Sequence, residues 1–506
     1  MRIFRAKRLL LTLAALASSA AHGQELAENL FDLSFGEFHG PALLDAPEVQ
    51  APVDETKSTE PNDPSEPDSA ISEGIQQVAY LAEDAAPSLE TKVTSATFEN
   101  SSVCRCPSCS HPFQASRRRG FLFGGWLQQG FTFNPSDPDN NSNAPVLFND
   151  RANDYQLNQL YFYIGKDVDP NASSWDIGGR FDLNYGTESR FVTVPGLERH
   201  DDRTRRWNSE SSDYGLAIPQ AFVELGTPLG PHGSSFQLGH FFALSGYETF
   251  TAPDNFFYSR ANSFLYGQPF THTGGVWNGK ITSDSAVSLG VTTGWDAFYD
   301  ETDSWGIRYA FLKEFGRGQT TFSMTGHVGD ENTGIQDADG ARKDTRNWVS
   351  LLVRHYLNKR LYYVLQGDYG RQDGAVLVLD SLSNTIGFDD ASWFSLNQYW
   401  VYQLNSQWSS GLRVEWFHDD GNSRMGLPIT YSNGGDAFDG GNYFAITGGL
   451  NFKPRDNVIL RSEFRWDFSD VESNPDIPAV VAGVRPFNDR SDDNQITMAV
   501  DAILTF

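Results

Sequence analysis

The chain has 506 residues, of which 39% are hydrophobic and 13% aromatic, and its 65 acidic and 38 basic residues give a formal net charge of −27. This excess of acid argues against nucleic-acid binding, which needs a basic surface to displace counterions from phosphates. Its 3 cysteines are too few for a dense disulfide framework.

The first 23 residues have the pattern of an export signal. Basic residues near the start precede an apolar run over residues 9–17, and small residues follow at Ala21 and Gly23. The apolar run is too short to cross the roughly 30 Å hydrocarbon core of a bilayer. We therefore expect a signal peptide over residues 1–23, cleaved before Gln24.

Residues 24–119 are expected to form an acidic, Pro-rich tail. The stretch 51–70 is crowded with Pro, Asp, Glu, Ser and Thr and has few apolar residues. Such a segment cannot bury enough apolar surface to offset the conformational entropy lost on ordering. The composition therefore predicts a disordered tail.

A Cys-rich patch lies within this tail, with Cys104, Cys106, Cys109 and His111 close together. Three thiols and one imidazole can supply the four ligands of a tetrahedral zinc ion. The spacing differs from that of paired zinc knuckles, so a local disulfide with one free thiol, or chance enrichment, are the alternatives. The patch is a candidate structural zinc site.

From about Gly120 onward, stretches of alternating apolar and polar residues recur, bounded by Gly, Pro, Asn or Asp. Alternation with period two predicts strands that have one apolar and one polar face. Clear examples are Phe181 and Leu183 beside Arg180 and Asp182, Leu412, Val414 and Trp416 beside Arg413 and Glu415, and Leu460, Phe464 and Trp466 beside Arg461, Glu463 and Arg465.

The connections between these strands decide the fold class. About sixteen strands are expected, with fourteen to eighteen open, and the gaps alternate between short and long, which is typical of a transmembrane antiparallel β-barrel. The sequence therefore predicts an all-β barrel over residues 120–506. The short gaps are expected at 167–173, 227–233, 283–284, 316–318, 358–359, 406–407 and 454–456, and the long ones at 134–153, 186–216, 245–273, 297–302, 330–344, 372–391, 419–440 and 470–493.

The charged residues on the polar strand faces are expected to face a water-filled lumen. Charges on one face of many strands are costly against a dry core and cost little against water. Structural ion pairing across strands is the alternative for any one of them. The lumen-facing candidates are Arg180, Asp182, Arg413, Glu415, Arg461, Glu463 and Arg465.

Aromatic residues near expected strand ends predict girdles at the two membrane interfaces, where amphipathic rings are favoured. Ordinary hydrophobic core is the alternative reading. The residues concerned are Phe131, Phe133, Tyr161, Tyr163, Trp295, Trp466 and Phe468.

The long gap from Ser245 to Thr273 is too aromatic for a solvent-exposed outer loop. Because aromatic bulk is better buried, we expect this gap to fold into the lumen and narrow it; packing on a neighbouring protomer is the alternative. Candidate constriction residues are Arg260 and His272 as solute contacts, with Glu248 and Asp254 as counter-charges.

Several segments resemble known sequences. The last strand, ending in Phe506, looks like the C-terminal signal read by the outer-membrane barrel-insertion machinery. The segments at 126–130, 156–161, 253–260 and 269–274 resemble the OmpL-like β-barrel porin family, a match over about residues 120 to 506. The resemblance implies an outer-membrane porin whose partners are outer-membrane lipid, the insertion machinery and small hydrophilic solutes. A homotrimer, common among such porins, is an assembly it suggests.

No catalytic motif of the Gly-x-Ser-x-Gly or His-Glu-x-x-His type is present, so we expect no enzymatic activity and no cofactor beyond zinc at the Cys-rich patch. The run from Asp337 to Gly340 could bind calcium, but it lacks the rest of an EF-hand loop and reads as a polar turn. The expected function is passive diffusion of small hydrophilic solutes or ions. The alternatives are a secreted soluble β-rich binding or surface protein, or a barrel with a structural or adhesive role.

Overall fold

The computed structural model describes residues 120–169, 174–200, 205–207, 213–230, 232–243, 245–298, 305–331, 345–379, 385–420, 423–425, 429–431, 435–436, 440–471 and 485–506. The expected signal peptide and acidic tail lie outside these residues. So do the candidate zinc ligands Cys104, Cys106, Cys109 and His111, and the acidic run at 337–340.

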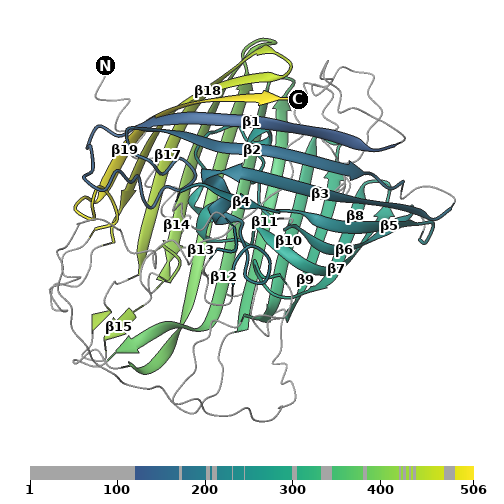
Figure 1. The fold of residues 1–506 in the computed structure, drawn as a ribbon, viewed down its shortest axis with the longest axis horizontal. Helices are drawn as coiled ribbons and strands as arrows, with labels where there is room; N and C mark the ends of the chain where they lie inside the picture. The colour runs from purple at the N-terminus through teal and green to yellow at the C-terminus, as the bar shows by residue number, and fades with distance from the viewer. Residues whose placement is uncertain are drawn as a thin grey trace. The chain divides into compact units, whose positions relative to one another are not determined.

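A single closed antiparallel barrel of sixteen long strands is built from the described residues (Figure 1). The first eight are β1 (Leu122–Phe133), β2 (Asp154–Lys166), β3 (Asp176–Gly186), β4 (Gly215–Ala217) continued by β5 (Ala221–Thr227), β6 (Ser234–Phe242), β7 (Thr271–Thr282), β8 (Ser285–Thr292) and β9 (Trp305–Phe315). The others are β10 (Thr320–Asp330), β11 (Thr345–Asn358), β12 (Leu361–Leu379), β13 (Thr385–Gln403), β14 (Trp408–Asp419), β17 (Gly441–Arg455), β18 (Val458–Ser469) and β19 (Asn494–Thr505).

The short elements belong to the connections or to an interrupted strand. β4 and β5 both pair with β3, so they count as one barrel strand interrupted at 218–220. The short strands β15 (Ile429–Tyr431) and β16 (Gly435–Asp436) lie in the connection between β14 and β17. The described helical segments are η3 (Thr187–Phe191), η4 (Ala252–Asp254) and α2 (Asn262–Tyr266). None of the described helices is long and apolar enough to cross a membrane.

Closure of the barrel occurs between its first and last strands. β1 and β19 pair along eight residues of each strand, from Trp126 opposite Thr505 to Phe133 opposite Met498. Beyond this register, the backbone of Phe506 exchanges two hydrogen bonds of 2.9 Å with the backbone of Gly125. The C-terminal residue therefore extends the pairing of β1 with β19 that closes the barrel.

The alternation of short and long connections is confirmed, with one difference. The gap predicted at 372–391 is mostly strand, because β12 and β13 remain paired up to Leu379 and Thr385 and leave only residues 380–384 between them. The run of Val and Leu at 376–379 favours extended pairing, and the Gly and Asp residues around it do not end the strand.

The two faces of the strands differ as the period-two pattern predicts. Leu412, Phe464 and Met498 are 41–48% exposed, whereas the polar residues next to them in sequence are buried. An apolar outer surface and a polar inner face are what a barrel in lipid requires, since backbone groups are satisfied between strands.

Three of the expected girdle aromatics lie on the other face. Tyr161 is fully buried and stacks on Trp126, with ring centroids 4.0 Å apart. Tyr163 packs near the same indole, and Trp295 is buried among inner aromatic residues. Their positions near strand ends suggested a girdle, but the strand parity of Tyr161 and Tyr163 places them with the inward residues, and Trp295 lies in the connection after β8. Phe131, Phe133 and Trp466 remain exposed on the outer face.

Candidate functional site

The connection between β6 and β7, here called loop 3 (residues 243–270), packs against the polar faces of strands that are distant in sequence. It contains η4 and α2, and most of its described residues are buried. Its contacts reach β2, β12, β13 and β17, and at β14 and β18 charged strand residues meet the backbone of the loop. These contacts define the candidate site.

Three charged residues of β18 bind the backbone of loop 3. Arg461 donates from Nη1 to the carbonyls of Ala252 (3.0 Å) and Asn255 (2.8 Å). The carboxylate of Glu463 accepts the N–H groups of two successive loop residues at 2.9–3.2 Å. Arg465 donates from Nη1 to the carbonyl of Arg260 at 2.7 Å. Spaced two residues apart, these three side chains lie on one face of the strand.

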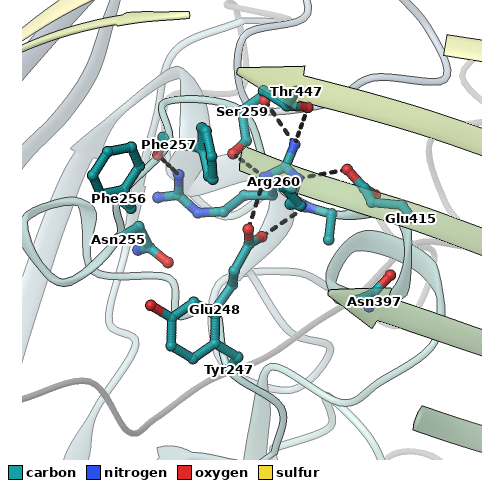
Figure 2. A network of polar contacts seen from close by, with 12 residues as sticks. Tyr247, Glu248, Asn255, Phe256, Phe257, Ser259, Arg260, Asn397, Glu415 and Thr447 are labelled. Atoms are coloured by element: carbon teal, nitrogen blue, oxygen red, sulfur yellow. Dashed lines mark hydrogen bonds and ion pairs between the residues drawn. The ribbon is translucent and has the colours of Figure 1, made fainter. Parts of the chain in front are cut away.

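A second group of anchors comes from β14 (Figure 2). Arg413 donates to the Glu248 carboxylate (2.7 Å), to the carbonyl (3.0 Å) and hydroxyl (3.0 Å) of Ser259, and to Thr447 Oγ1 of β17 (3.1 Å). Glu415 receives the Nε of Arg413 at 2.6 Å and the backbone N–H of Asn262 at 2.7 Å. Glu248 also accepts the N–H of Ala261, so the loop is tied to itself and to the strand by the same carboxylate.

These five strand charges are sealed from solvent by loop 3. Each is under one-tenth exposed. Burial of a charge is tolerable only when it is paired and hydrogen-bonded, and the ion pairs here meet that condition. The arginines pair with carboxylates as follows: Arg413 with Glu248 and Glu415, Arg461 with Asp501, and Arg465 with Asp467 and Glu415.

The remaining pair of the predicted lumen-facing set lies elsewhere. Arg180 donates from Nε to Asp182 at 2.7 Å on β3. Asp182 also accepts the hydroxyl of Tyr161 and the side-chain amide of Gln220. This cluster does not contact the charged residues of β14 or β18 in any described interaction.

The four predicted constriction residues are not brought together. Glu248 faces Arg413, as described above, while Asp254 accepts the hydroxyl of Thr251 within its own turn. Arg260 is fully buried, and its guanidinium donates to the loop carbonyls of Thr249, Phe257 and Tyr258. Burial lowers the pKa of Arg260.

His272 lies at the start of β7, outside the loop network. Its Nδ1 is 3.0 Å from the carbonyl oxygen of Gly294, and its ring stacks on that of His327 with centroids 5.2 Å apart. It is buried, so a direct contact with solute would need a rearrangement of its surroundings.

Glycines on the inward strand faces make hollows for the aromatic rings of loop 3. A Cβ added at Gly411 would lie 2.4 Å from the Phe256 ring, and one at Gly130 would lie 2.6 Å from Tyr258. Gly449 is similarly close to Phe257 at 3.1 Å. The absence of a side chain at these positions therefore lets the rings approach the sheet.

Other connections contribute residues that sequence reasoning missed. Phe148, from the connection after β1, stacks on Phe191 of η3 at 5.2 Å and meets Phe264 of loop 3 edge-on at 5.5 Å. The guanidinium of Arg424, from the connection after β14, lies 4.8 Å from the ring centroid of Trp393 and donates to the Tyr266 carbonyl at 2.7 Å. An aromatic residue in an otherwise polar gap is a sequence signal for Phe148, whereas no sequence pattern indicates the role of Arg424.

Within the described ranges, no group of three or more His, Cys, Asp or Glu residues is placed to hold a metal ion.

Solved structures with a similar fold are outer-membrane proteins of low sequence identity. The channel DcaP of Acinetobacter baumannii is 10% identical, with a TM-score of 0.47 over 78% of this chain and 100% of its own. The anion-selective porin from Comamonas acidovorans is 10% identical, with a TM-score of 0.48 over 76% and 99%. OmpT of Vibrio cholerae, in a trimer form, is 8% identical, with a TM-score of 0.44 over 76% and 99%. No curated protein matches the chain.

The family described as "Putative beta-barrel porin-2, OmpL-like" matches residues 120–506, which are the residues that form the barrel. This confirms the resemblance found in the strand and loop 3 sequences, and with the closed sixteen-strand barrel it places the protein in the outer membrane. The chain belongs to the OmpL-like beta-barrel porin family and is an outer-membrane porin.

Proposed function

We propose that the barrel lets small hydrophilic solutes diffuse down their gradients through a lumen that loop 3 narrows. The observation that carries this proposal is the anchoring of the loop backbone by charged residues of β14 and β18. A segment held by ion-paired side chains at several points keeps a fixed cross-section, which a selective diffusion path requires.

The same anchoring contacts support a channel that does not change its solutes chemically. The carboxylates and guanidinium groups of the site are engaged with one another and with loop carbonyls, so none is presented as a nucleophile or general base. We propose that solutes pass unchanged and that no cofactor takes part. A homotrimer is the assembly we propose, and the Cys-rich patch stays a zinc-site prediction that metal analysis with Cys106→Ser would test.

The proposal is tested with the refolded full chain in planar bilayers and in liposomes. We expect discrete conductance steps and liposome swelling with small sugars that declines as sugar size increases. A barrel with only a structural or adhesive role would give neither result.

Loop 3 is tested by deletion. Removing Asn255 to Phe264 should raise single-channel conductance several-fold, because these residues cover the charged strand faces. The matched control removes ten residues, 473–482, from the gap between β18 and β19. Unchanged conductance in a folded loop 3 deletion would count against the constriction.

A further inference from the structure

Arg308 of β9 is a buried cation without a counter-charge. Its side chain is 2% exposed, and Nη1 donates to the hydroxyl of Ser288 at 3.1 Å. Nη2 has no hydrogen-bond partner, and no carboxylate of the described chain forms an ion pair with this guanidinium. The buried arginines of β14 and β18 each have at least one carboxylate, so Arg308 is chemically different from them.

The neighbours of Arg308 add further unpartnered donors. The hydroxyl of Ser288 donates to Asn278 Oδ1 at 2.8 Å, and this fixes the amide so that Asn278 Nδ2 carries the free N–H groups. Gln237 on β6 also has no partner for either atom of its side-chain amide. Gln237, Asn278, Ser288 and Arg308 lie on the consecutive strands β6 to β9, and all are buried.

Among the described residues, no ion pair joins a carboxylate to Arg308. His327, opposite Arg308 on β10, receives the indole N–H of Trp295 on Nδ1 at 3.0 Å and so is engaged as a neutral imidazole. The carboxylate-bearing Glu224 on β5 lies opposite Gln237, four strands along the sheet from Arg308, so the donors that stand apart from it are those of Arg308 and Asn278. Arg308 and Asn278 therefore combine one positive charge with unpartnered N–H donors, which an anion requires.

We propose that Arg308 Nη2 and Asn278 Nδ2 bind a small inorganic anion of the size of chloride on the inner wall of the barrel. The unpartnered atoms are closed off from solvent, which favours a monatomic ion over a larger organic anion. An ion there neutralises the guanidinium and satisfies donors that are otherwise left without partners. Both residues lie on barrel strands, Asn278 on β7 and Arg308 on β9, outside loop 3.

The test measures the thermal midpoint of the refolded full chain in detergent, followed by the loss of its fast-migrating folded band. Chloride should raise the midpoint over gluconate at equal ionic strength and sodium concentration by about 2–4 °C, because a ligand that binds only the folded state stabilises it. Arg308→Gln should abolish the difference. The matched control is Lys313→Gln, which removes a cation of the same strand that already pairs with Asp284 at 2.8 Å, and it should keep the difference.

If Arg308→Gln does not fold, two further measurements test the anion site. Asn278→Leu should shift the half-maximal chloride concentration upward by several-fold. Bromide soaked into crystals of the unaltered protein should give an anomalous peak within contact distance of Arg308 Nη2. Equal midpoints of the unaltered protein in the two salts, a chloride effect that survives Arg308→Gln, or bromide peaks only elsewhere would each overturn the site.

Discussion

The carboxylate of Glu463 on β18 accepts the backbone N–H of Ser259 in loop 3, across 204 residues of sequence. The same carboxylate accepts the N–H of Tyr258 at 2.9 Å. Loop 3 is thus held at this point through its backbone. Two charge-assisted hydrogen bonds to adjacent N–H groups also fix the direction of the chain.

Glu463→Gln should loosen this attachment. The amide keeps one acceptor oxygen and places a donor beside the N–H of Ser259, which then keeps at most one of its two bonds to this side chain. We expect a loss of about 1–3 kcal/mol in the free energy of unfolding. Single-channel recordings should show larger current fluctuations than those of the unaltered protein.

The control for this variant is Ser462→Ala on the exposed face of the same strand. It should leave stability and current noise unchanged. If Glu463→Gln behaves like Ser462→Ala in both measurements, the carboxylate does not anchor loop 3.

The glycine hollows give a second prediction. In Gly411→Ala the new Cβ would lie 2.4 Å from a Phe256 ring atom, so the ring must leave its place against β14. Overpacking of this kind costs about 1–3 kcal/mol. Urea unfolding of the refolded protein should therefore show a lower midpoint.

The matched control is Gly448→Ala on β17, where an added Cβ meets nothing within 4 Å. Its unfolding midpoint should equal or exceed that of the unaltered protein. Equal midpoints for Gly411→Ala and Gly448→Ala would show that Phe256 does not need the hollow.

The strands of the barrel could be predicted from the sequence because their outer face meets lipid along its whole length within the membrane. Lipid demands an apolar residue at every second position, so Phe464 and Trp466 identify the outer face and Arg465 the inner one without knowledge of any partner. Beyond the part of a strand that faces lipid, an apolar residue at every second position is no longer required, so the alternation predicts the strand less well. Residues 376–379 continue as strand beyond a Gly- and Asp-rich stretch that reads as loop.

The site could be predicted only in part, because its partners are set by the fold. The alternation placed Arg413 and Arg461 on the polar face, but not against the carbonyls of loop 3, which lie 154 and 209 residues away in sequence. The aromatic content of loop 3 indicated burial. The hollow at Gly411 and the stacking of Arg424 on Trp393 depend on contacts that leave no pattern in the sequence.

The pair of Arg461 and Asp501 gives a third prediction. The guanidinium binds both carboxylate oxygens, at 2.8 and 2.5 Å, and both side chains are buried. Arg461→Gln leaves the carboxylate of Asp501 without its cation, and breaking a buried pair in this way costs about 3–5 kcal/mol.

A double-mutant cycle separates the pair from the loop contacts of Arg461. Adding Asp501→Asn to Arg461→Gln removes the unpaired charge, so the double variant should lose less stability than the sum of the two single variants, by about 1–3 kcal/mol. Additive losses in urea unfolding would mean that the two side chains are not coupled.

Glu188 of η3 gives a prediction about pH. Its carboxylate accepts the side-chain amides of Asn158 and Gln159, but burial dominates and raises the pKa of Glu188 from 4.5 to about 7. Between these two values the folded protein retains a proton that the unfolded chain has released. The contribution of Glu188 to stability is therefore full below about pH 4.5 and falls as pH rises toward 7.

Glu188→Gln removes this titration. The difference in unfolding free energy between about pH 5 and pH 8 should shift by up to about 3 kcal/mol in the variant, because one pKa unit corresponds to about 1.4 kcal/mol. The direction is fixed: the unaltered protein loses more stability on going to the higher pH than the variant does. Parallel pH profiles of the thermal midpoint for the two proteins would show that Glu188 titrates normally in the folded barrel. A larger loss of stability with rising pH in the variant than in the unaltered protein would contradict the burial of the Glu188 carboxylate.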